Sequence, residues 1–257
     1  ASSNCVNLEM YKKYFVIIFY FLFILMGTLS LVFIPNALAY SSGSILALFV
    51  ISLPLLYFLY SKLGLRVMML LVGSLSTLAL LIEYIGLVTG WPYGSFIYTG
   101  HLGCKILGIL PWTVGLSWTP LVIGSVALVY ANTRIKILRI ILPVFLLVVF
   151  DLLLDPVAVH LGMWSYVYGG IYYSVPIQNF VGWIFSGLIG SLMCFVFLDK
   201  LSDKKIYQLA YSFFISIVFW TVVSIGLGLI APVFFGLCLI VYSIVIYYKN
   251  NEKAYYN

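Results

Sequence analysis

The chain has 257 residues, of which 64% are hydrophobic and 8% are charged, whereas a soluble domain is about 45–50% apolar and about 25% charged. This composition cannot supply a water-soluble surface, so a soluble globular protein is excluded. The net charge of +6 does not indicate nucleic-acid binding, because the basic residues stand in short clusters between apolar runs, where membrane topology explains them.

The apolar runs predict an all-α, polytopic transmembrane helical bundle. A run of about 20 apolar residues is long enough to cross a hydrocarbon core of about 30 Å. We therefore expect about eight spans, with seven possible, in a single integral membrane domain covering 1–257. The predicted spans are 14–34, 44–60, 67–87, 113–131, 137–154, 181–198, 207–227 and 231–248.

The ends of the first run raise the question of a signal peptide. The segment Ala37-Leu38-Ala39 resembles a cleavage site, but the apolar run before it is too long for a usual signal peptide, so we expect a retained first helix. Twelve of the thirteen Lys and Arg residues lie in the tails and the even-numbered connections, and only Lys105 lies in an odd one. The positive-inside rule then predicts a multi-pass protein of the cell membrane with both termini cytoplasmic.

Two long external connections, 88–112 and 155–180, are rich in Gly, Pro, Trp and Tyr. The stretch that begins Gly90-Trp-Pro-Tyr is echoed by the one that begins Gly162-Met-Trp-Ser-Tyr, and each follows a span with acidic residues near its outer end. A parallel internal repeat would place both loops on one shared external cavity. The alternative is an aromatic belt, which gathers Trp and Tyr at the headgroup layer of membrane proteins in general.

Three acidic residues lie within or at the end of predicted spans: Glu83 in the third, and Asp151 and Asp155 at the end of the fifth. A carboxylate at such depth costs on the order of 2.5–3.5 kcal/mol, so each needs a partner, a proton or a function. Asp151 and Asp155 are four residues apart and share a helical face. Two neighbouring negative charges are unfavourable there, so one carboxyl is expected to keep its proton and could act as an acid. Otherwise, Asp155 could cap the helix before Pro156 and Glu83 could bond another helix.

Two segments resemble the signatures of the membrane carotenoid biosynthesis protein family of the carotenoid hydratase type. The first is Glu83-Tyr-Ile-Gly-Leu-Val-Thr-Gly-Trp-Pro-Tyr-Gly94 with Tyr98. The second is Asp151-Leu-Leu-Leu-Asp-Pro156 with Gly162-Met-Trp164, extended by Tyr172-Tyr-Ser-Val-Pro-Ile-Gln-Asn-Phe-Val-Gly-Trp183. The resemblance covers 80–183, about two-fifths of the chain, which we take as the functional core.

The resemblance implies addition of water to the terminal isopropylidene double bond of an acyclic carotenoid, without an organic cofactor. The expected partners are the lipid bilayer, a carotenoid or other long isoprenoid, and water, with no nucleic acid. No metal is expected, because the four cysteines have neither CxxC spacing nor nearby histidines. The predicted catalytic residues are Asp155, Asp151 and Glu83. The predicted substrate-binding residues are Trp91, Tyr93, Tyr98, His160, Trp164, Tyr172 and Asn179.

Three other activities remain open at the level of sequence. A lycopene-type cyclase would form the same cation and capture it with an internal double bond. An intramembrane prenyltransferase would use Asp151 and Asp155 to bind a magnesium diphosphate, although it needs a second acidic motif on another helix. A proton-coupled transporter would use the buried carboxylates as relays.

Overall fold

A computed structural model describes residues 2–34, 41–198 and 206–255, and the segment Ala37-Leu38-Ala39 lies outside this part of the chain. Within the described ranges, seven helices are long and apolar enough to cross a membrane. They are α1 (Ser2–Phe33), α2 (Ser41–Thr89), α3 (Thr113–Asn132), α4 (Lys136–His160), α5 (Ile177–Leu198), α6 (Tyr211–Gly226), which the short helix η2 (Ile206–Ala210) precedes, and α7 (Ile230–Tyr255). The prediction of an all-α polytopic bundle is confirmed.

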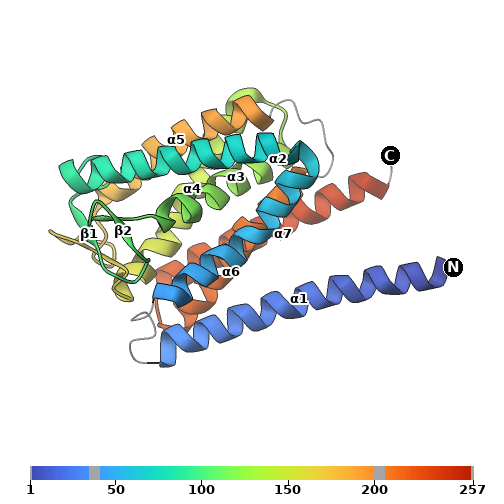
Figure 1. Cartoon of the computed structure of the whole chain (residues 1–257), viewed down its shortest axis with the longest axis horizontal. Helices are drawn as coiled ribbons and strands as arrows, with labels where there is room; N and C mark the ends of the chain where they lie inside the picture. The colour runs from blue at the N-terminus through green and yellow to red at the C-terminus, as the bar shows by residue number, and fades with distance from the viewer. Residues whose placement is uncertain (1, 35–40, 199–205, 256–257) are drawn as a thin grey trace.

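Helix α2 accounts for two of the predicted spans. Its 49 residues would measure more than twice the thickness of a hydrocarbon core of about 30 Å if the helix were straight. The helical backbone is interrupted at Gly64, where φ is 75° and ψ is 167°. Glycine adopts a positive φ without steric cost, so the chain can fold back at this residue. Figure 1 shows the two halves of α2 running in opposite senses on either side of this bend, in agreement with the predicted spans 44–60 and 67–87.

The ends of the helices and their connections gather at two opposite ends of the molecule. In Figure 1, α1 begins and α7 ends at the same end as the bend in α2 and the connection from α3 to α4. The ammonium group of Lys249 donates a hydrogen bond to Asn132 Oδ1 at 3.1 Å, which ties α7 to that connection. Lys105 lies at the opposite end, in strand β2 (Lys105–Ile106). The two termini therefore lie on one side, as the distribution of basic residues predicts.

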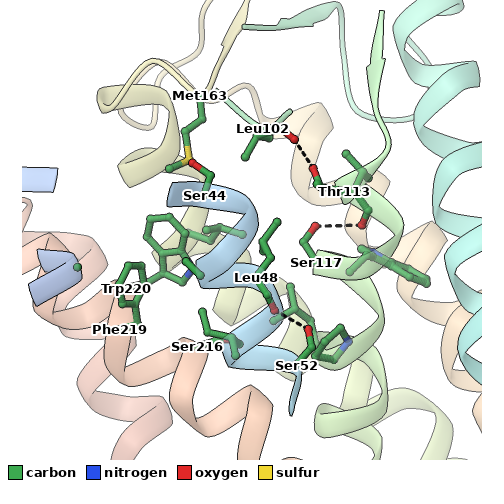
Figure 2. Close-up of a pocket in the computed structure, with 18 of the residues that line it drawn as sticks. Ser44, Leu48, Ser52, Leu102, Thr113, Ser117, Met163, Ser216, Phe219 and Trp220 are labelled. Carbon is green, nitrogen blue, oxygen red and sulfur yellow. Dashed lines mark hydrogen bonds between the residues drawn. The ribbon is translucent and has the colours of Figure 1, made fainter. Parts of the chain in front are cut away.

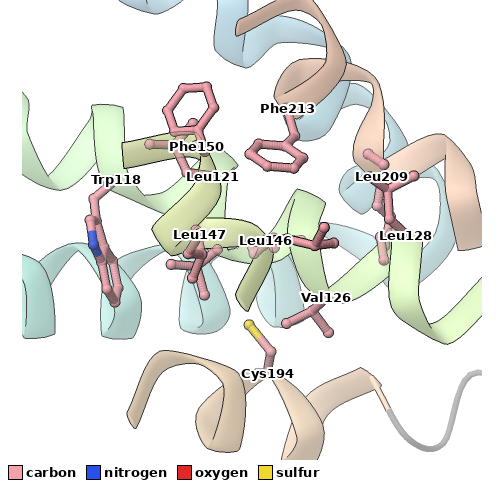
Figure 3. Close-up of a cluster of buried hydrophobic side chains, with 14 of the residues drawn as sticks. Trp118, Leu121, Val126, Leu128, Leu146, Leu147, Phe150, Cys194, Leu209 and Phe213 are labelled. Atoms are coloured by element: carbon pink, nitrogen blue, oxygen red, sulfur yellow. The ribbon is translucent and has the colours of Figure 1, made fainter. Parts of the chain in front are cut away.

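Helix α3 is the centre of the bundle, and α1 is at its edge. The apolar window of α3 is 83% buried, whereas that of α1 is 6% buried. Figure 3 shows the core that surrounds α3, in which Phe150 of α4 and Phe213 of α6 pack with their ring centroids 5.3 Å apart. Gly124 allows α3 to approach α6 closely, because a Cβ there would lie only 2.3 Å from Phe213 Cβ. This core fixes the outer ends of the helices that carry the acids.

Four short strands order the external loops. Strand β1 (Phe96–Tyr98) pairs antiparallel with β4 (Trp164–Tyr166), with Phe96 opposite Tyr166 and Tyr98 opposite Trp164. Strand β2 pairs in the same way with β3 (Leu110–Pro111). The two loops with similar sequences are thus brought together, as the repeat predicted, although the strands themselves were not anticipated.

Helix α4 extends further than the sequence indicated. The predicted span ended at 154, with Asp155 as a possible cap before Pro156, but the helix continues through this proline to His160. The predicted end of the span at 154 and the interpretation of Asp155 as a cap are therefore both wrong. Proline has no N–H to donate to the carbonyl four residues earlier, so Leu152 lacks its helical partner. The hydroxyl of Tyr172 donates to the Leu152 carbonyl at 2.8 Å and replaces the missing bond.

Candidate active site

Asn179 holds Asp151 and Asp155 together. Helix α5 begins at Ile177, which places Asn179 in its first turn. The Asn179 side-chain nitrogen donates to Asp151 Oδ2 at 2.6 Å and to Asp155 Oδ2 at 2.7 Å. All three side chains are at least 97% buried. Two carboxyls that share one donor in a buried site cannot both carry a charge at low cost, so the pair is expected to retain a proton.

Asp155 and Glu83 each accept a hydrogen bond from a tyrosine hydroxyl. Tyr166 in β4 donates to Asp155 Oδ2 at 2.6 Å, and Tyr98 in β1 donates to Glu83 Oε2 at 3.1 Å. Burial, and next the neighbouring carboxyl groups, hold the pKa of both tyrosines well above the usual value, so each phenol keeps its proton at neutral pH. Because β1 pairs with β4, the strands also fix Glu83 of α2 relative to Asp155 of α4.

A cavity of about 800 Å³ opens beside these groups. Asp155 and Glu83 line it, whereas Asp151 does not. Asp155 is therefore the member of the aspartate pair that a bound molecule could touch. The other predicted residues on the wall are Tyr93, Tyr98, Trp164 and Asn179. Three aromatic residues outside the predicted site set, Phe96, Tyr166 and Trp183, complete this end of the cavity.

The rest of the cavity is mostly apolar and extends away from the acids. Its walls come from α1, the first half of α2, α3 and α6. Figure 2 shows Leu48 of α2, Phe219 and Trp220 of α6 and Met163 around this space, with serine hydroxyls between them. Ser52 uses its hydroxyl hydrogen within its own helix, by donating to the Leu48 carbonyl at 2.7 Å. A long hydrocarbon would find apolar surface here and a carboxyl group at one end.

Three predicted residues lie away from the cavity. Trp91 is 50% exposed and packs against Phe185, with ring centroids 4.7 Å apart. His160 is exposed at the end of α4. Tyr172 does not line the cavity and instead bonds the α4 backbone. These three residues are close to the acids in the sequence, but they do not line the cavity.

Tyr172 is suited to a positioning role, because Leu152 lies between the two aspartates on α4. We expect Tyr172→Phe to leave the Leu152 carbonyl without its donor and to let this turn of the helix shift, which displaces Asp155. The expected result is a loss of about 1–3 kcal/mol in the free energy of unfolding, since that is the cost of an unsatisfied buried group. The melting temperature of the purified variant in detergent measures this effect. Tyr173→Phe is the matched control because Tyr173 is 40% exposed, and equal melting temperatures in the two variants would contradict the role.

The acids do not form a metal site of the usual kind. Within the described residues, no three His, Cys, Asp or Glu side chains are grouped as ligands of one ion would be. The donors that contact the carboxyls are two phenols and one amide. The chemistry that these groups can perform by themselves is proton transfer.

The chain is similar to known proteins over most of its length. A family model described as carotenoid biosynthesis protein matches residues 40–243. The bisanhydrobacterioruberin hydratase of Haloarcula japonica is 35% identical over 168 residues, which are 62% of this chain and 56% of that protein. The chain thus spans little more than half the length of this relative. No solved structure matches it significantly. The family match covers most of the chain and all the helices that carry the acids, and the chain belongs to the carotenoid biosynthesis protein family.

Proposed function

We propose that this protein is a hydratase of the cell membrane, which adds water to the terminal double bond of an acyclic carotenoid end group. The observation that carries the proposal is the position of Asp155, a carboxyl that shares a buried amide with Asp151 and faces a long apolar cavity. Membership of the carotenoid biosynthesis family supports a polyene substrate, and the name of the Haloarcula relative supports hydration. The chemistry would lie within 80–183, and the apolar walls come partly from outside this range.

The first step is protonation of carbon. The terminal isopropylidene group lies against Asp155, and the π electrons of the double bond take the carboxyl proton to form a C–H bond at the less substituted carbon. The other carbon becomes a tertiary cation, and Asp155 becomes a carboxylate. Tyr166 and Asn179 already donate hydrogen bonds to Asp155 Oδ2, so they stabilise the charge that appears there.

The cation forms beside aromatic rings. Trp164 packs edge-on against Tyr98 with ring centroids 5.8 Å apart, and both line the cavity. The negative face of an aromatic ring stabilises a cation by about 0.5–2 kcal/mol. This stabilisation prolongs the lifetime of the cation, so that water can reach it.

Water then completes the reaction. Glu83 accepts a hydrogen bond from Tyr98 and lines the same cavity, so its other oxygen is free to orient a water molecule toward the cation. The water oxygen forms the C–O bond and gives one proton to Glu83. Return of a proton from Glu83 to Asp155 through the site restores both groups, and the net change is one alkene and one water to one tertiary alcohol.

The proposal is tested by expressing the chain in cells that accumulate lycopene. A hydratase would raise the mass of the pigment by one water per end, compared with an empty-vector control and with the Asp155→Asn variant. An altered retention time without a change of mass would instead identify a cyclase. If no acyclic carotenoid were converted by a correctly inserted protein, the proposed function would be wrong.

A further inference from the structure

The cavity beside the acids is exposed on one flank. Most of the residues that line it are buried or half-buried, but five are exposed. These five all come from α1 and the first turns of α2: Phe19, Leu22, Met26, Gly43 and Leu46. A residue that lines a cavity and is also exposed on the outer surface lies at its mouth. Among the described residues, the opening therefore lies on the flank formed by these two helices.

Helix α1 contacts the bundle along one side. Phe23 stacks on Phe219 of α6 with ring centroids 5.9 Å apart, and Tyr20 donates a hydrogen bond to the Val50 carbonyl of α2 at 3.1 Å. In Figure 1, α1 stands at the edge of the molecule, next to the first half of α2 and α6. Because these are spanning helices, the exposed side chains between them meet lipid. The mouth therefore faces the bilayer interior.

We propose that this opening, the α1–α2 portal, admits the hydrocarbon substrate sideways from the bilayer. The identity of the substrate as a long polyene rests on the proposed function, but the position of the portal does not. A polyene is dissolved in the lipid core, so a lateral path spares it any passage through water. Its leading end passes between α1 and α2 and advances to Asp155, while the trailing chain stays in the apolar part of the cavity or in lipid.

The chemistry of the rim also selects what can pass. The four exposed side chains at the mouth are hydrocarbon or thioether groups, and none can neutralise a charge. A charged headgroup would have to cross this rim at membrane depth, which is strongly unfavourable. The portal is thus suited to neutral polyenes and unsuited to prenyl diphosphates.

Gly43 provides a direct test, because a side chain can be added at the mouth without disturbing the helix. Among the described residues, a Cβ on Gly43 would meet no atom within 4 Å, and the same is true of Gly73 in the second half of α2. Both glycines are exposed, but only Gly43 lines the cavity. Gly43→Trp is therefore the blocking variant, and Gly73→Trp is its matched control.

The measurement is the amount of lycopene that co-purifies with each protein in lipid nanodiscs, together with the amount of hydrated product. We expect Gly43→Trp to bind at least tenfold less lycopene than the wild type, and Gly73→Trp to bind the same amount. Leu46→Trp, which adds bulk to an exposed side chain, should reduce binding as well. Gly73→Trp should also keep the wild-type yield of hydrated product, because Gly73 does not line the cavity.

Wild-type binding in both rim variants would overturn the portal, and so would an equal loss of binding in Gly73→Trp, since that result would indicate a general effect of the added indole. The proposed function fails in a different way. If the wild type binds lycopene but forms no hydrated product, while the rim variants lose the pigment, the portal stands and the hydratase assignment does not.

Discussion

Replacing Asp155 by asparagine is expected to abolish hydration while the protein stays folded. The amide has nearly the same shape as the acid, and its oxygen can still accept the hydrogen bond from Tyr166. It carries no acidic proton, so the double bond cannot be protonated. Loss of a general acid lowers turnover by about 10²- to 10⁴-fold. Turnover per inserted protein, followed by the mass of the pigment, measures the effect, and an unchanged melting temperature in detergent shows that the fold is kept.

Asp151→Asn is the matched control for this experiment. Asp151 shares the donor Asn179 with Asp155 but does not line the cavity, so its replacement should weaken turnover without eliminating it. The loss should be about tenfold, because Asp155 no longer has a neighbouring carboxyl that favours its protonated form. If Asp151→Asn were inactive while Asp155→Asn remained active, Asp151 would be the proton donor. Full activity in both variants would refute the mechanism.

Glu83→Gln is expected to separate the two halves of the reaction. The amide cannot take a proton from water, so the tertiary cation forms but is not captured, and the yield of alcohol should fall by about 10²-fold or more. The cation can still return its proton to Asp155. In D₂O the atom added to the alkene is deuterium, because Asp155 exchanges its proton with solvent before each attempt. When the cation then loses its original hydrogen or a methyl hydrogen instead, deuterium stays in the recovered polyene.

Deuterium content therefore distinguishes the roles of the two acids. Glu83→Gln should retain exchange into the substrate and lose the alcohol, whereas Asp155→Asn should lose both. Mass spectrometry of pigment recovered from membranes incubated in D₂O gives the two quantities in one experiment. If Glu83→Gln made alcohol at the wild-type rate, Glu83 would have no part in activating water, and its bond to Tyr98 would be structural.

The membrane helices could be predicted from the sequence because they depend on local properties. Length, hydropathy and the distribution of Lys and Arg gave all the spans, and the bend at Gly64 follows from a glycine between two apolar runs. The end of α4 could not be predicted in this way. Pro156 normally breaks a helix, and its tolerance depends on a hydroxyl from Tyr172, which lies 20 residues away from Leu152.

The acids, Asn179 and Tyr98 were recognisable from the sequence as site residues, but the contacts among them were not. A carboxyl in a membrane span is conspicuous because its burial is costly. Asn179 was predicted as a substrate-binding residue, and nothing near it in the sequence shows that it donates to both aspartates of α4. Tyr166 was hidden in the same way among many aromatic residues. The two-residue alternation of Phe96 with Tyr98 and of Trp164 with Tyr166 was the available signal, because it puts each pair on one face of a strand.

The fold of α2 at Gly64 has a consequence for how substrate and water are brought together. The helix leaves the outer side of the membrane near Gly43, reverses, and returns to that side at Glu83. One hairpin therefore carries residues of the proposed α1–α2 portal on its first arm and Glu83, the proposed base for water, on its second. In this proposal the hydrocarbon and the water molecule meet between the two arms of one hairpin. A change in the angle at Gly64 would alter access and chemistry together, although the hinge itself lies on the far side of the membrane.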